Sequence, residues 1–171
     1  MHLVISCSLN KFSRSRLMAQ YAFDLYCKDA KIIDLKDIDF PICDGDACYE
    51  DPIVDELKKS ISISESILIA SPIYNFDFNA VAKNLIELTG SSWKDKLVGF
   101  ISAASGTSSY MSPMSFANSL MLDFRCIIIP RFVYADKKCF IGEHDMVDEI
   151  KNRLEDLVET SILLSHALIR K

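Results

Sequence analysis

The segment from residue 6 to residue 15 concentrates side chains that can bind an anion. It reads Ser-Cys-Ser-Leu-Asn-Lys-Phe-Ser-Arg-Ser and supplies four hydroxyls, one amide and two cationic groups. A helical pattern begins at Ser13, and the free N–H groups and dipole of a helix N-terminus favour negative charge. This combination predicts a site for a phosphate monoester. The side chains that we expect to contact the phosphate are Ser8, Asn10, Ser13 and Ser15, with positive charge nearby from Lys11 and Arg14.

Neither of two familiar nucleotide-binding loops is present in this segment. A Walker loop would need Gly-Lys-Ser or Gly-Lys-Thr after a glycine and four further residues, and a dinucleotide turn would need Gly-x-Gly-x-x-Gly. The alternative interpretation is an ordinary helix that is capped by Ser13 and has incidental serines before it.

A second segment, Ser71–Phe78, carries groups that suit a flat and partly polar ring. Proline restricts the backbone, tyrosine and phenylalanine offer broad apolar faces, and asparagine both donates and accepts hydrogen bonds. An apolar run precedes the segment and a helical pattern follows it. The residues that we expect at the ring are Pro72, Ile73, Tyr74, Asn75 and Phe76. The alternative is a strand-to-helix loop with two anchoring aromatic residues.

A third segment, Ala103–Ser109, consists of small residues that let a backbone approach a ligand closely. We expect Ser105 and Gly106 to take part in binding, although an ordinary turn would have the same composition.

The elements that must position these segments form five β-α repeats. Apolar runs predict strands at residues 2–6, 31–35, 66–70, 96–102 and 125–129, and periodic patterns predict helices at 13–28, 52–61, 79–88, 112–123 and 143–169. Residues 132–141 are expected to be irregular. This alternation predicts a flavodoxin-like α/β/α sandwich with a five-stranded parallel sheet of order 2-1-3-4-5. The three segments follow the first, third and fourth strands, so they should meet at one edge of the sheet.

Composition narrows the possible functions. The chain has 171 residues, half of them hydrophobic, which suits a single domain over residues 1–171. A net charge of −5 disfavours nucleic-acid binding, and we expect neither a membrane span nor a signal peptide. Six scattered cysteines predict reduced thiols in a cytoplasmic protein. Cys43 and Cys48 have the wrong spacing for zinc, so we predict no metal site.

The chain resembles the NAD(P)H-dependent FMN reductases, which include quinone, chromate and azo-dye reductases. Their Pro-x-Tyr-Asn turn stands here at Pro72–Asn75 and is followed by Lys83-Asn84 at matching spacing. Their Gly-Ser-x-Arg-x-x-Ser loop is matched by Ser8 and Ser13, while Cys7 replaces the glycine and Asn10 the arginine. The third loop has fewer glycines than is usual in the family.

The resemblance implies an oxidoreductase that takes hydride from NADPH or NADH onto FMN and then reduces a small-molecule electron acceptor. It also implies that the flavin carries the chemistry without a catalytic side chain, and that the protein is a homodimer or homotetramer. Backbone groups of Tyr74, Asn75 and Gly106 would contact the pyrimidine end of the ring. Two alternatives remain open at this point: a flavin-binding electron carrier without its own NAD(P)H site, and a non-flavin interaction domain on the same fold.

Overall fold

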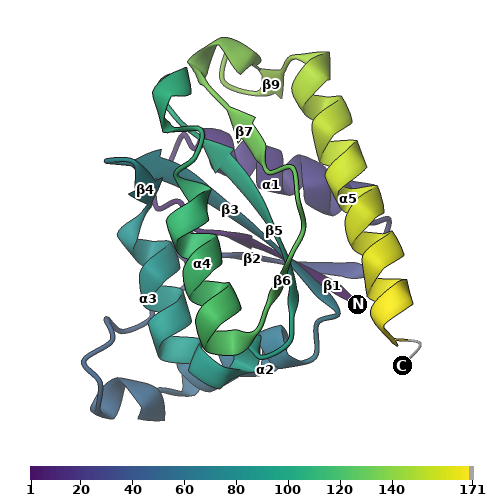
Figure 1. Cartoon of the computed structure of the whole chain (residues 1–171). Coiled ribbons are helices and arrows are strands. Elements are labelled where there is room, and N and C mark those ends of the chain that lie inside the picture. Colours follow the sequence, from purple (N-terminus) through teal and green to yellow (C-terminus); the bar gives the residue numbers. More distant parts are fainter. Residues whose placement is uncertain (170–171) are drawn as a thin grey trace.

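The computed structural model describes residues 1–169. It forms three layers, with a mostly parallel sheet between two layers of helices (Figure 1). The strands are β1 (His2–Ser6), β2 (Ala30–Asp34), β3 (Ser66–Tyr74), β4 (Asp77–Phe78), β5 (Leu97–Ala103), β6 (Ile127–Ile128), β7 (Val133–Ala135), β8 (Phe140–Ile141) and β9 (Asp145–Met146). The helices are α1 (Arg14–Leu25), α2 (Pro52–Ser62), α3 (Ala80–Thr89), α4 (Pro113–Phe124) and α5 (Asp148–Ile169). The predicted domain includes residues 170 and 171, which lie outside the described residues.

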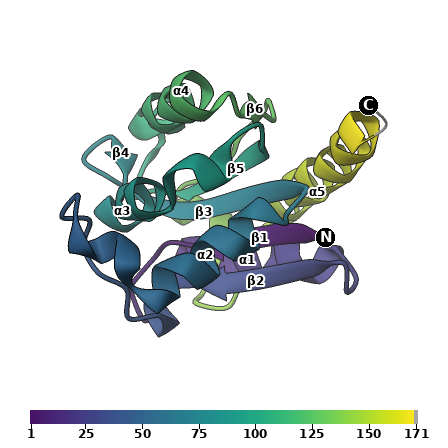
Figure 2. The ribbon, with the colours of Figure 1, turned by 90° about the horizontal axis from the view of Figure 1, so that it is seen from below.

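The central strands follow the order β2-β1-β3-β5-β6, which is the predicted order of parallel strands. Figure 2 shows β5, β3, β1 and β2 one after another across the sheet. Alternate residues of each strand face opposite layers, because side chains along a strand point to opposite faces. Leu3 and Ile5 contact the core under α2, α3 and α4, whereas Val4 contacts the core under α1 and α5.

The prediction of five strands is wrong, because the main sheet has seven. Of the predicted fifth strand, residues 125–129, only β6 forms a strand, and β7 follows it as a separate strand. β6 and β7 pair with opposite halves of β5. Pro130 has no N–H for a sheet bond, and Arg131 takes a left-handed φ of 63°. The sheet edge is therefore interrupted between β6 and β7. β7 and β8 also lie within residues 132–141, which were expected to be irregular.

The additional strand β4 turns the second segment into a β-hairpin. Tyr74 pairs with Asp77 in antiparallel register, and the two residues between them have φ values of 52° and 63°. Positive φ at both central positions is the geometry of a type I′ turn, which matches the twist of the flanking strands. The strand before it is therefore longer than predicted, and the helix after it starts from a hairpin rather than from a simple loop.

The last helix begins at Asp148, five residues later than the pattern predicted. Residues 140–146 form instead the small hairpin of β8 and β9. This hairpin lies close to the start of α5 in Figure 1, and it bears on the site described next.

Candidate functional site

The first segment forms a loop whose polar side chains bond to its own backbone. The Ser8 hydroxyl accepts a hydrogen bond from the Asn10 N–H at 3.3 Å, and the Asn10 side-chain oxygen accepts one from the Phe12 N–H at 2.9 Å. Ser13 is the N-cap of α1, because its hydroxyl accepts from the Arg16 N–H at 3.1 Å. The Ser13 and Ser15 hydroxyls are 3.0 Å apart. The loop is thus ordered before any ligand arrives.

Arg16 fixes the shape of this loop by bonding to its backbone carbonyls. Its Nη2 donates to the Ser8 carbonyl at 2.6 Å, and its Nη1 donates to the Asn10 carbonyl at 2.7 Å. The Asp34 carboxylate, at the end of β2, accepts from the Arg16 Nε. In a trans peptide the C=O and the next N–H point in opposite directions. The N–H groups after these two carbonyls therefore point away from the guanidinium, which leaves them available to an anion.

Asn79 joins the first segment to the second. Its side-chain nitrogen donates to the Cys7 carbonyl at 2.7 Å. Its side-chain oxygen accepts from the Ser71 hydroxyl and from the Ala82 N–H, both at 3.1 Å, and the latter bond caps α3. Asn79 is buried, so these bonds take the place of hydrogen bonds to water. The two loops are therefore fixed relative to one another.

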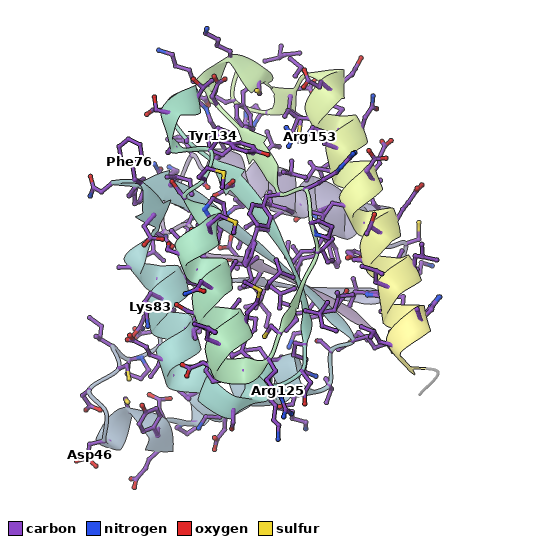
Figure 3. The ribbon with its side chains drawn as sticks, in the orientation of Figure 1. Asp46, Phe76, Lys83, Arg125, Tyr134 and Arg153 are labelled. Carbon is purple, nitrogen blue, oxygen red and sulfur yellow. The ribbon has the colours of Figure 1, made fainter. Side chains whose placement is uncertain are left out.

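The hairpin is held over the sheet by an aromatic cluster. The ring of Phe78 lies 5.4 Å from that of Phe100 and 4.8 Å from that of Phe116 on α4. The Ser115 hydroxyl also donates to the Asp77 carboxylate at 2.8 Å. The turn itself projects outward: Tyr74 is 53% exposed and Phe76 is 68% exposed, and Figure 3 shows Phe76 directed away from the body.

The third segment is tied down by β7. The Ala104 N–H donates to the Ala135 carbonyl at 2.9 Å. The Tyr134 hydroxyl donates to the Gly106 carbonyl and lies 2.9 Å from the Ser109 hydroxyl. These bonds hold a loop with a single glycine in a defined shape.

The three loops enclose a cavity of about 470 Å³ at the carboxyl edge of the parallel strands. The predicted residues that line it are Ser8, Asn10, Ser13, Ser15, Pro72, Ile73, Tyr74 and Ser105. A smaller cavity of about 280 Å³ shares Ile73, Ala104 and Ser105 with it. It is also lined by the remaining predicted residues, Asn75, Phe76 and Gly106. The structure therefore brings all eleven predicted residues to one edge. Lys11 does not line the larger cavity; its ammonium lies 5.5 Å from the centre of the Phe12 ring.

Several residues at the cavity were not anticipated. Phe12, Gly142 and Glu143 line it, the last two from the β8–β9 hairpin. Arg14, which was expected to add positive charge nearby, also lines it. Its guanidinium lies 5.2 Å from the centre of the Phe140 ring, which connects α1 to that hairpin. The contribution of this hairpin could not be foreseen because its residues are nearly 130 positions from the first loop. Its first strand was expected to be irregular, and residues 143–146 were expected to be helical. Arg16 and Asn79 offered only their polarity as a signal.

The chemistry of the cavity suits phosphate and a ring more than it suits a redox thiol or a metal. In the described part of the chain, the N–H groups of Arg14 and Ser15 at the start of α1 donate to no protein acceptor. Cys7 is fully buried beside the cavity, and burial raises the pKa of its thiol far above the usual range, which makes it inert. Among residues 1–169, no group of three or more metal-ligating side chains is clustered.

The fold and these loops define a flavodoxin-like protein with a cavity at the carboxyl edge of its parallel strands. The sequence matches the family described as NADPH-dependent FMN reductase over residues 2–140, and the chain belongs to that family. This membership confirms the prediction of an FMN-dependent oxidoreductase that uses NAD(P)H.

Individual relatives agree with the family assignment. The chain is 30% identical to an NADPH:quinone oxidoreductase of Arabidopsis thaliana over 115 residues, which are 63% of this chain and 59% of the relative. It is 27% identical to the probable NADPH:quinone oxidoreductase 2 of Oryza sativa subsp. japonica over 90% of this chain and 83% of the relative. FerB, a flavoenzyme NAD(P)H:(acceptor) oxidoreductase from Paracoccus denitrificans, has a similar fold, with a TM-score of 0.79 at 19% identity over 97% of each chain.

Proposed function

We propose that the chain reduces a small electron acceptor, such as a quinone or free flavin, with NAD(P)H as reductant and FMN as the bound cofactor. The observation that carries the proposal is the convergence of a phosphate-type loop, an aromatic hairpin and a small-residue loop around one cavity. The donor set fits FMN, because the cavity is lined by hydroxyls of the first loop, by Tyr74 of the hairpin and by small residues of the third loop.

The residues have separate proposed tasks. Ser13 and Ser15, with the N-terminal N–H groups of α1, would hold the phosphate, and Ser8 and Asn10 would complete the cradle. Pro72, Ile73, Tyr74, Asn75 and Phe76 would bind one side of the ring, and Ser105 and Gly106 would approach its polar end. FMN, when bound, would accept hydride and pass reducing equivalents to the acceptor. The protein would bind and orient the reactants, and no side chain would need to move a proton.

Steady-state kinetics tests this proposal. Purified protein with FMN should oxidise NADPH or NADH continuously when a quinone or free flavin is supplied. A protein that retains flavin but oxidises neither nicotinamide would be an electron carrier, and a protein that retains no flavin would be an interaction domain. Replacing Ser13 by Ala and Tyr74 by Ala should weaken flavin retention; if both variants hold FMN as tightly as the parent, the site assignment is wrong.

Three further assignments belong to this proposal. We propose one domain over the whole chain, a homodimer or homotetramer, and a cytoplasmic location. The six free cysteines of the described chain support a reducing compartment. No helix among residues 1–169 is long and apolar enough to cross a membrane. Light scattering after size-exclusion chromatography measures the oligomeric state, and a monomer at micromolar concentration would contradict that assignment.

A further inference from the structure

The tip of the β8–β9 hairpin brings a carboxylate to the cavity that we assign to FMN. Ile141 pairs with Asp145, so residues 142–144 form the tip, and Gly142 takes a left-handed φ of 65° there. Gly142 and Glu143 both line the cavity of about 470 Å³. Within the described part of the chain, Glu143 is the only carboxylate among the lining residues. An acidic group at this place opposes a phosphorylated ligand, because like charges repel.

The hairpin is anchored to two helices, so its tip has a defined position. Met146 is buried in the core under α1 and α5, and the Asp145 carboxylate lies 2.9 Å from the Lys151 ammonium on α5. Figure 1 shows β9 next to the first turns of that helix. On the other side, the Phe140 ring lies 5.2 Å from the Arg14 guanidinium. This contact brings the hairpin to the start of α1, which is the end of the cavity that we assign to the phosphate.

The charged side chains at this end of the cavity nearly cancel one another. Arg14 is the only cationic side chain among the lining residues of the described chain. Lys11 lies outside the cavity, and the charge of Arg16 is paired with that of Asp34. Glu143 is exposed and makes no hydrogen bond or ion pair within residues 1–169. Its negative charge is therefore not neutralised by a described neighbour, and it acts on a ligand that enters the cavity.

A carboxylate beside a flavin can act in two ways. It can accept hydrogen bonds from the hydroxyls of the ribityl chain, or it can repel the phosphate. Exposure of Glu143 favours the second role, because water competes for hydrogen bonds at an exposed group. Repulsion needs no direct contact, since charges in water act over a Debye length of about 10 Å at 0.1 M ionic strength.

We propose that Glu143 sets the preference between flavins, because its charge weakens the binding of FMN and leaves that of riboflavin unchanged. The inference rests on the proposed function, since it takes the cavity to be the flavin site. A charge at the rim of a site acts mainly on association, so FMN should enter more slowly than it would without this residue. The family match ends at residue 140, so the hairpin tip lies beyond the residues that establish the family.

Quenching of flavin fluorescence by the full chain, freed of flavin, tests the proposal with FMN and riboflavin as probes. At about 0.01 M ionic strength, Glu143→Gln should bind FMN about fivefold more tightly than the parent, and Glu143→Lys more tightly still, because a like charge is removed or reversed. Riboflavin affinity should stay within about twofold of the parent in both variants, since riboflavin has no phosphate to repel. At about 1 M salt, where the Debye length is about 3 Å, the differences in FMN affinity should largely disappear.

Glu149→Gln is the matched control for this experiment. Glu149 is an exposed carboxylate in the first turn of α5, and it lines neither of the two site cavities. Its substitution changes the net charge by the same amount as Glu143→Gln, so it should leave both flavin affinities unchanged.

The other outcomes separate this inference from the proposed function. Unchanged or weaker FMN binding by Glu143→Gln would overturn the inference, and weaker binding would make the carboxylate a hydrogen-bond acceptor for the flavin. Equal tightening of FMN and riboflavin, or equal tightening of FMN by Glu149→Gln, would overturn it as well. A parent that binds neither flavin would instead refute the proposed function, and the role of Glu143 with it.

Discussion

Replacement of Arg16 by Met is predicted to weaken FMN binding much more than riboflavin binding. Arg16 shapes the first loop through two carbonyls at 2.6 and 2.7 Å, and its side chain is only 21% exposed. The N–H groups that follow these carbonyls therefore point away from the guanidinium, and we propose that they face the phosphate. Riboflavin has the same ring but no phosphate, so it should be nearly indifferent to the shape of this loop.

The size of the effect follows from the two lost contacts. A hydrogen bond from a charged donor is worth about 1.5–3 kcal/mol, and part of that energy orders the free protein rather than the complex. We therefore expect FMN to lose about 2 kcal/mol, which is about thirtyfold in Kd. Riboflavin should change by about threefold or less, since only the loop that faces the phosphate is loosened.

Quenching of flavin fluorescence measures both affinities. Arg125→Met is a matched control, because Arg125 also donates to an aspartate, Asp95, at 2.9 Å, yet lines none of the cavities described here. It should leave both affinities unchanged. Equal weakening of FMN and riboflavin by Arg16→Met would show that the arginine supports the whole fold rather than the phosphate loop, and an unchanged FMN affinity would refute the reasoning entirely.

Three further predictions concern stability, and each is checked by urea unfolding. Phe76→Gly should stabilise the chain by about 1 kcal/mol, because Phe76 has a φ of 63° that glycine adopts without strain, and its ring is largely exposed; a loss of stability would contradict the type I′ assignment. Gly99→Ala should destabilise by about 1–3 kcal/mol, because a Cβ there would lie 2.7 Å from the Leu68 Cδ2 and 3.2 Å from the Leu157 Cδ1; a neutral result would mean that both leucines can move. Burial lowers the pKa of His2, whose Nδ1 lies 2.8 Å from the Ser66 hydroxyl, so the unfolded chain takes up a proton first as the pH falls below 6.5. The contribution of neutral His2 to the free energy of unfolding should therefore be complete above pH 6.5 and be lost as the pH falls through the lower folded pKa. A His2→Gln variant whose free energy of unfolding kept the same slope between pH 7 and pH 5 would assign the effect to other groups.

Much of the fold could be predicted because the central strands are apolar on both faces. The runs at β1, β3 and β5 are buried along nearly their whole length, and only a sheet covered on both sides accommodates such runs. The order of the parallel strands followed from this pattern and from the handedness of crossovers.

The errors in the predicted fold have local causes. A two-residue strand such as β4 has no periodicity to detect, and its pairing depends on left-handed φ values at Asn75 and Phe76, where Phe is an unusual residue. The apolar residues on either side of Pro130 read as one strand followed by irregular chain, although both halves pair with β5. The start of α5 was placed too early because residues 143–147 continue its polar and apolar alternation.

The candidate site was easier to predict for the groups that face the cavity than for the groups behind it. Serines before a helix and an aromatic turn after a strand indicate a ligand once the predicted strand order brings them to one edge of the sheet. Arg16 and Asn79 act through bonds to backbone carbonyls of distant residues, and no pattern in the chain marks a carbonyl as an acceptor. Tyr134 is similar, because it supports the third loop from a strand that was not predicted.

Anaerobic titration of the FMN-loaded protein with NADPH tests the central claim most directly, because it asks whether one cavity holds the flavin within reach of the nicotinamide. We predict that one equivalent of NADPH abolishes the visible absorbance of the oxidised flavin. A protein that binds no FMN, or whose bound FMN stays oxidised with excess NADPH and excess NADH, would contradict the account.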